Sequence, residues 1–462
     1  AFCFYRAATQ SFTIDESATF LRYVDVPINE AFSSFTANNH VLLTLLMRAS
    51  RWLLGRSELV LRIPALLGCA LYLTSAYRLT ETSIRRNWSR LVALMVLTLN
   101  PLVLDLLVAA RGYSLALGFS MWALYLGWSD LKENRPRRLW WAGLCAGLAI
   151  SANLVFAIPL CMLGLVLIPE YARQGRFWEL IDGYAGPAAV ICFVLLFLPL
   201  SKFSSDEFYF GVAKLSETTA SLLGESLWQP FGGLFLIDAL TQVAPRAREF
   251  FINTLSAGLL IVIGFSAVWL MTRRQRGMEA LLLGFVLSIS ILSVATWVLM
   301  NKALGVLFPM TRTAVYILPL IGFAGALAAD LSRTRIASMA FTSLTVLLAT
   351  LYVSELRATY FSEWRSEAGM KRLMRRLVHD TRDRENGSAV TAGGSWDLEF
   401  SIRYYRVRYR AGWIRVLGVE ERKSETPEYF FLGPDDRKLV DQLKLKVIEQ
   451  DDTSGTLLAR RT

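Results

Sequence analysis

Long apolar segments recur along most of the chain and restrict the folds it can adopt. About twenty helical residues cross the ~30 Å hydrocarbon core of a bilayer, and roughly ten segments approach that length. They are residues 60–80, 90–108, 113–129, 139–152, 154–170, 183–201, 251–271, 279–299, 314–331 and 336–354. The hydrophobic share of 54% also exceeds that of ordinary soluble domains. We therefore predict an all-α polytopic membrane protein with about ten spans, in which 139–152 and 154–170 form a hairpin turning near residues 151–153.

Basic residues gather in every second loop between these segments. The basic loops contain Arg85, Arg86 and Arg90, then Lys132, Arg135, Arg137 and Arg138, then Arg173 and Arg176, then Arg273, Arg274 and Arg276, then Arg333 and Arg335. By the positive-inside rule these loops are cytoplasmic, which makes the alternate loops and the tail extracytoplasmic in a plasma (inner) membrane protein. The net charge of +11 is largely explained by these loops and requires no nucleic-acid partner.

The remaining segments are more polar and define the predicted organisation. Residues 1–354 form a transmembrane domain with outer loops 13–58 and 202–250, and the first loop carries surface helices near 16–25 and 40–54. Loop 202–250 either covers a cavity or is a plain connector. Residues 355–462 form a small extracytoplasmic α/β domain, with helices near 357–379 and 434–443 and strands at 389–392, 429–432, 445–448 and 456–459. Residues 396–409 are either helix or strand, and the first dozen residues suggest that a transmembrane helix precedes them.

An acid pair, Asp15 and Glu16, opens the first outer loop. A carboxylate beside a low-dielectric boundary can act as a general base, and Asp15 is the first candidate for that role. The alternative is structural, because acids in the first turn of a helix interact favourably with its dipole by roughly 0.3–1 kcal/mol.

Further polar residues lie at the predicted outer ends of the spans. Arg111 either pairs with Asp105 or binds a phosphate, for which its planar fork of donors is suited. Arg312 either extends to the lipid headgroups or joins Arg111 at that phosphate. His40, with Asn39 beside it, either contacts a metal, sugar or phosphate or only caps a helix. Together these residues predict a lipid phosphate held at the membrane surface next to a base.

Several short motifs carry a family resemblance. Asp15-Glu16, residues 38–42 (NNHVL) and residues 57–64 (SELVLRIP) resemble the N-terminal signature of the polytopic GT-C glycosyltransferases. The similarity is greatest to the bacterial branch of the protein O-mannosyltransferases and the lipid A aminoarabinose transferase. Residues 110–115 (ARGYSL) and 309–319 resemble later elements of that branch, so the resemblance covers residues 13 to about 330.

The resemblance implies a reaction. Such enzymes transfer a sugar from a polyprenyl phosphate to an extracytoplasmic lipid, glycan or protein, without a nucleotide. Asp15 matches the proposed base, with Glu16 as its neighbour, and Asp105 matches an acid that organises the site or a divalent metal ion. Arg111 and Arg312 match less closely the residues that hold the donor phosphate.

One departure concerns that phosphate. Asn39-His40-Val41 stands where relatives acting on lipid A carry Lys-Pro-Pro, so a phosphate-binding lysine is absent and His40 or Arg111 would replace it. Two other functions stay open, a transporter or flippase of lipid-linked sugars and an inactive scaffold. Transporters usually bind substrate near the bilayer midplane, whereas the candidate residues here lie at the ends of the spans, which favours the enzyme.

Overall fold

The computed structural model describes residues 1–33, 36, 38–203, 210–227, 277–332, 335–385 and 389–461. The predicted span 251–271, much of loop 202–250 and the basic residues Arg273, Arg274, Arg276 and Arg333 lie outside these residues. The described chain is mostly helical, and it ends in a five-stranded sheet.

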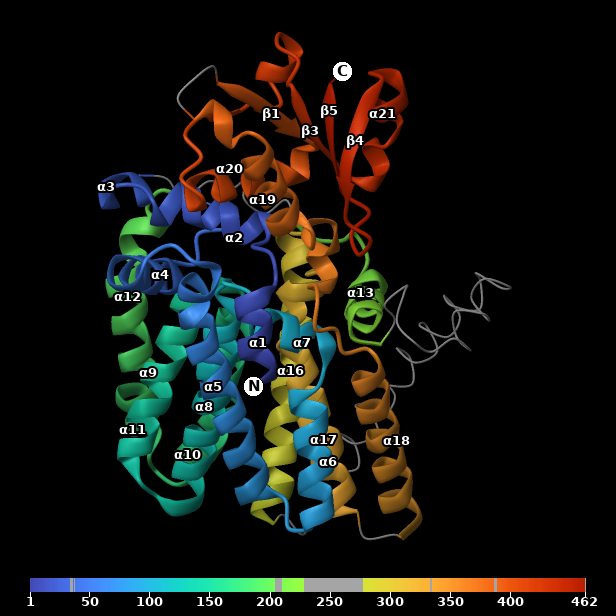
Figure 1. The fold of residues 1–462 in the computed structure, drawn as a ribbon. Helices are drawn as coiled ribbons and strands as arrows, with labels where there is room; N and C mark the ends of the chain where they lie inside the picture. The colour runs from blue at the N-terminus through green and yellow to red at the C-terminus, as the bar shows by residue number, and fades with distance from the viewer. Residues whose placement is uncertain are drawn as a thin grey trace.

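Long helices run side by side and make up most of the molecule (Figure 1). They are α5 (Glu58–Ser83), α6 (Asn87–Thr98), α8 (Tyr113–Glu133), α9 (Pro136–Ala152), α10 (Ala157–Arg173), α12 (Gly186–Leu200), α16 (Met278–Leu304), α17 (Ile317–Leu331) and α18 (Arg335–Ser354). Shorter helices are α7 (Pro101–Leu106), α11 (Phe177–Leu180) and α13 (Leu215–Leu227), and a π-helical turn, Ile181–Ala185, joins α11 to α12.

Some of these helices have the length and composition of membrane spans. Within the described ranges, four stretches do so, namely Glu58–Ser83, Leu154–Arg173, Phe177–Leu200 and Met278–Leu304, and α17 and most of α18 are shorter apolar helices. On α12, Val190, Phe193 and Phe197 are each more than 60% exposed, a surface suited to lipid and not to water. The chain is therefore a multi-pass membrane protein, although among the described helices fewer are long and apolar enough to cross a bilayer than the ten spans predicted.

Two breaks in the helices position polar residues. The predicted span 90–108 is wrong as a single helix, because Asn100 and Pro101 end α6 and begin α7. The Asn100 side chain accepts a hydrogen bond from the backbone N–H of Val103 at 3.1 Å, and proline is favoured in the first turn, where no N–H is needed. The hairpin predicted near 151–153 is confirmed, since α9 ends at Ala152 and Asn153 adopts an extended backbone before α10.

Short helices begin the chain; α1 (Phe2–Thr9) stands among the long helices beside α5, and those after it lie over their ends (Figure 1). The helices of loop 13–58 are α2 (Ile14–Thr19), a π-helical turn (Phe20–Val24), α3 (Ile28–Ala31) and α4 (Val41–Leu54). Helix α2 begins with a capping box, in which the Glu16 N–H donates to the Thr13 hydroxyl and the Thr13 N–H donates to the Glu16 carboxylate. The two helices predicted in this loop are therefore confirmed.

The tail forms a mixed sheet with helices around it. Its elements are a 3-10 segment (Ser362–Glu367), α19 (Met370–Asp380), β1 (Val390–Gly394), α20 (Glu399–Arg408), β2 (Ile414–Val416), β3 (Tyr429–Leu432), α21 (Lys438–Gln442), β4 (Leu445–Gln450) and β5 (Leu457–Arg461). The strand order is β2-β1-β3-β5-β4, with β1 parallel to β2 and β3 and the other pairs antiparallel. The ambiguous segment 396–409 is mainly helical, and the three-residue strand β2 was not predicted.

The tail packs directly on the residues that join α1 to α2. The Phe12 N–H donates to the Tyr405 hydroxyl at 2.8 Å, and the Ser11 hydroxyl donates to the Ala368 carbonyl at 2.6 Å. The rings of Phe12 and Tyr404 stack with centroids 4.4 Å apart. These contacts hold the segment Ser362–Glu367 beside α2, where the predicted acid pair lies.

Candidate functional site

A cavity of about 420 Å³ lies between the first outer loop and the long helices. The residues before α4, the start of α8, the α9–α10 turn, α16 and the segment before α17 line it. Its apolar lining includes Leu154, Ile158, Leu196, Trp297 and Leu307. Its polar lining includes Asn38, Asn39, His40, Arg111, Asn153 and Arg312, so the predicted phosphate residues converge on one cavity.

Asp15 lies between the two predicted arginines. Its carboxylate is 3.1 Å from a guanidinium nitrogen of Arg312 and 3.7 Å from one of Arg111, and it accepts a hydrogen bond from the Trp364 indole N–H at 3.2 Å. Burial raises the pKa of Asp15, but the two guanidinium groups outweigh it, so the pKa lies below its usual value. Asp15 is therefore a carboxylate at neutral pH, and both of its cationic partners line the cavity.

Arg111 is buried, with 2% of its surface exposed, and not all of its N–H groups are hydrogen-bonded to described residues. Its terminal nitrogens donate to the Asn38 side chain at 2.9 Å and to the Asp15 carbonyl at 3.4 Å. Its buried Nε has no partner among the described residues. An unpartnered buried N–H is costly, so a ligand oxygen in the cavity would stabilise it. The alternative in which Arg111 pairs with Asp105 is not observed.

His40 lines the cavity and is neutral at pH 7. Burial and the charge of Arg111 hold the pKa of His40 well below its usual value, and the ring bonds to the Ala152 backbone. Because Nε2 has no partner, that bond involves Nδ1, and a neutral ring donating through Nδ1 leaves Nε2 as an acceptor. His40 is thus suited to a hydroxyl group more than to a phosphate. It stands at the N-terminus of α4, but its side chain makes no capping hydrogen bond.

The close approach of the α9–α10 turn to His40 depends on Gly112. A Cβ on Gly112 would lie 1.8 Å from the Ala152 carbonyl oxygen and 2.9 Å from the His40 ring. Asn39 is also beside the cavity, but its side chain accepts from Thr44 at 3.0 Å and donates to the Ala31 carbonyl at 3.4 Å. Asn39 therefore holds the loop together within the lining.

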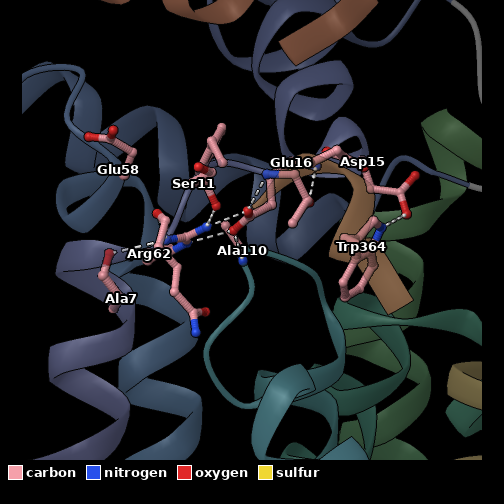
Figure 2. Close-up of polar contacts among 12 residues, drawn as sticks. Ala7, Ser11, Asp15, Glu16, Glu58, Arg62, Ala110 and Trp364 are labelled. Atoms are coloured by element: carbon pink, nitrogen blue, oxygen red, sulfur yellow. Dashed lines mark hydrogen bonds and ion pairs between the residues drawn. The ribbon is translucent and has the colours of Figure 1, made fainter. Parts of the chain in front are cut away.

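Glu16 points away from Asp15 into a different network (Figure 2). It is fully buried and forms a two-pronged ion pair with Arg62, at 2.8 Å and 2.6 Å, and also accepts from the Ala110 N–H at 2.5 Å. Arg62 in turn donates to three backbone carbonyls that precede α2, at residues 7, 10 and 11. All of these contacts are structural. Glu16 does not line the cavity, and the catalytic role predicted for it is not supported.

Asp105 has a partner that the sequence did not indicate. Its carboxylate pairs with Arg6 at 2.5 Å and accepts from the Ser362 N–H at 2.7 Å. A cation thus already occupies one oxygen and a backbone donor the other, an arrangement that does not suit a metal ligand. In the part of the chain that the structure describes, no group of three or more His, Cys, Asp or Glu side chains could hold a metal ion. The metal role predicted for Asp105 is not supported.

The tail contributes two residues to the site that sequence reasoning missed. Glu363 accepts from Arg312 at 2.9 Å, and Trp364 donates to Asp15. Both lie about 350 positions after Asp15 in a segment with many charges of both signs, which offers no signal to single them out. Asn38, which orients Arg111, could have been found, because it belongs to the Asn38-Asn39-His40 motif.

Comparison with known proteins gives structural similarity only. No known family model matches the sequence, and no curated protein matches it significantly. The chain is similar to ArnT from Cupriavidus metallidurans in the apo state, with 15% identity, a TM-score of 0.47 and coverage of 100% of this chain and 96% of that one. A second ArnT structure, bound to undecaprenyl phosphate, gives 13% identity, a TM-score of 0.45 and the same coverages.

Two other solved structures are similar as well. The Archaeoglobus fulgidus oligosaccharyltransferase, in complex with zinc and sulfate, has 12% identity, a TM-score of 0.47 and coverage of 99% of this chain and 69% of that one. The arabinosyltransferase EmbB from Mycobacterium smegmatis has 10% identity, a TM-score of 0.39 and coverage of 76% and 36%. At such identities and TM-scores these similarities assign no activity and no site residue to this chain.

Proposed function

We propose that the protein is a membrane glycosyltransferase with a GT-C-like fold. It moves a sugar from a polyprenyl-phosphate-linked donor to a lipid, glycan or protein acceptor. One observation carries this assignment: Asp15 is an ionised carboxylate held between Arg111 and Arg312 beside a cavity that is mostly apolar. The donor has the same combination of features, because it carries a phosphate, a sugar and a long hydrocarbon chain.

The arginines supply what the departing phosphate needs. Negative charge accumulates on the phosphate as its bond to the sugar breaks, and buried donors stabilise that charge strongly because little water screens them. Arg111 offers its unpartnered Nε to such an oxygen. The apolar side chains of the cavity, Leu154 and Leu307 among them, suit the first isoprene units.

Asp15 is the proposed base. As the acceptor hydroxyl attacks the anomeric carbon, its proton passes to the Asp15 carboxylate and the new oxygen–carbon bond forms. The bond from that carbon to the phosphate oxygen breaks, and its electron pair leaves with the polyprenyl phosphate. Attack opposite the leaving group inverts the anomeric centre. His40 Nε2, an unpartnered acceptor, is suited to a sugar or acceptor hydroxyl.

The charge distribution supports an orientation for this site. The loops with Arg85 and Lys132 would be cytoplasmic, and Lys132 lies beside the end of α5, where its ammonium group donates to the Thr82 carbonyl. The cavity and the tail from residue 355 would then be extracytoplasmic. In that arrangement the transmembrane domain 1–354 and the α/β domain 355–462 would both contribute to one site at the outer face of the plasma membrane.

Transfer by purified protein in nanodiscs tests the function. The lipid-linked sugar that accumulates in a deletion strain indicates which sugar to test. Radiolabelled polyprenyl phosphates that carry this sugar then serve as donors. We expect Asp15→Asn to lose at least 100-fold in transfer rate, in line with the loss of a general base, while still binding the donor. Asp25→Asn is the matched control, because Asp25 belongs to the same loop but pairs with Arg51 and Arg56.

Two outcomes would contradict this assignment. An unchanged transfer rate in Asp15→Asn refutes the base. Movement of the lipid-linked sugar across the bilayer without any transfer identifies a flippase, which would use the same cavity for a different task.

A further inference from the structure

The tail places a second carboxylate at the proposed catalytic arginine. The same terminal nitrogen of Arg312 lies 3.1 Å from Asp15 Oδ2 and 2.9 Å from Glu363 Oε1. Glu363 comes from the 3-10 segment Ser362–Glu367, and Asp15 comes from α2. One cation therefore serves two acids that belong to distant parts of the chain.

Only one of the two carboxylate oxygens of Glu363 has hydrogen-bond partners among the described residues. Its Oε1 also accepts from the Thr311 hydroxyl at 3.3 Å, whereas its Oε2 is buried with no hydrogen-bond partner among the described residues. Thr311 adopts a φ of 43°, a left-handed conformation that is rare for a β-branched residue. The neighbouring Ser362 N–H is fixed on Asp105. Two unfavourable features therefore lie together here, a carboxyl group with an unpaired buried oxygen among the described residues and a threonine in a strained backbone conformation.

The ionisable groups that face Asp15 come from four parts of the fold. Arg111 precedes α8, Arg312 precedes α17, His40 precedes α4, and Glu363 and Glu367 lie in the tail segment. Burial raises the pKa of Glu363 and, well beyond its usual value, that of Glu367, and the negative charge of Asp15 raises both further. Glu225 also raises the pKa of Glu363. Since His40 is neutral, the two arginines are the cations that hold Asp15 ionised.

We propose that Glu363 is a positioning residue, which competes with Asp15 for the guanidinium of Arg312 and so sets how readily Asp15 takes a proton. An Asp15 paired to both arginines without competition would be a weaker base. Sharing Arg312 with Glu363 keeps Asp15 ionised yet leaves it able to accept the proton of the acceptor. The role of Asp15 as base belongs to the proposed function, whereas the competition for Arg312 can be measured without any substrate.

Carboxyl titration by pH-difference infrared spectroscopy provides that measurement. The carbonyl band that disappears in Asp15→Asn identifies Asp15 in the full-length protein. In Glu363→Leu the second acceptor at Arg312 is gone, whatever its protonation state when Asp15 titrates, so Arg312 pairs with Asp15 alone and the Asp15 titration should move to lower pH by roughly 0.5–1 unit. In Trp364→Phe the indole donor to Asp15 is lost, so the titration should move to higher pH by a similar amount. The acid limb of the pH–rate profile for transfer should move in the same two directions.

Opposite shifts separate this role from a general loss of structure, which would move neither titration in a defined direction. Should Glu363→Leu fail to accumulate, Glu363→Asp withdraws the carboxyl group by one methylene and should give a smaller shift of the same sign. An Asp15 titration that stays within about 0.2 unit of wild type in the Glu363 variants would overturn the proposal. Absence of sugar transfer by the wild-type protein would instead count against the proposed function, and the infrared result would stand independently.

Discussion

The neighbouring acids Asp15 and Glu16 should respond oppositely to loss of their charge. We predict that Glu16→Gln destabilises the fold and that Asp15→Asn mainly removes activity. In Glu16→Gln the side-chain volume is kept, but the fully buried Arg62 loses its counter-charge. The new amide group would also face N–H donors from Arg62, Thr13 and Ala110, where only acceptors fit.

The size of the effect follows from these contacts. Removing one partner of a buried ion pair typically costs about 3–5 kcal/mol, because the other charge stays buried without compensation. Three backbone carbonyls still accept from Arg62 at 2.7–3.2 Å and will stabilise part of its charge, so the lower part of that range is expected. Glu58→Gln is the matched control. Glu58 is buried, but its partners Lys371 and Arg408 are partly exposed and stay solvated when its charge is lost, so the substitution should cost only about 1 kcal/mol.

The free energy of unfolding can be measured in mixed micelles titrated with a denaturing detergent, with tryptophan fluorescence as the readout. Donor binding to the same samples reports on the cavity. Glu16→Gln with wild-type stability and abolished transfer would refute the reasoning, because it would make Glu16 a catalytic group despite its burial. A double variant, Glu16→Leu with Arg62→Met, should recover part of the lost stability, since an apolar pair leaves no buried charge.

Three further predictions concern the cavity. Arg111→Ala should raise the KM for the donor about 10–100-fold with a smaller change in kcat, and Arg111→Lys should recover only part, because lysine lacks the planar fork; an unaltered dependence on donor concentration would argue against a phosphate contact. Gly112→Ala should lower the free energy of unfolding by roughly 1–3 kcal/mol, whereas Gly224→Ala, where a Cβ meets nothing within 4 Å, should be neutral or slightly stabilising. Because the pKa of His40 is lowered in the folded protein, the unfolded chain binds a proton at a higher pH than the folded one does. The free energy of unfolding should therefore fall as the pH drops below about 6.5. In pH-dependent unfolding curves, His40→Asn should lessen that fall.

Local features were largely predictable from the sequence. The surface helices, the turn before Asn153 and the strand at residues 429–432 all follow from periodicity and turn residues near in the chain. The error at 90–108 was avoidable, because Asn100-Pro101 is a helix-start pattern inside an apolar run. The ambiguity at 396–409 was genuine, since its aromatic and β-branched residues suit a strand, and packing of α20 against Phe12 decides in favour of a helix.

The sequence by itself determined that this is a membrane protein, that an acid pair opens the loop 13–58 and that arginines stand near the ends of its predicted spans. Tertiary structure alone decided which acid pairs with the arginines of the cavity, because adjacent helical residues point about 100° apart and only packing selects the side. It also paired Asp105 with Arg6 and brought Glu363 to Arg312. Caps and helix periods depend on neighbours a few residues away, whereas these pairs join distant segments whose meeting depends on how the whole bundle and the tail pack.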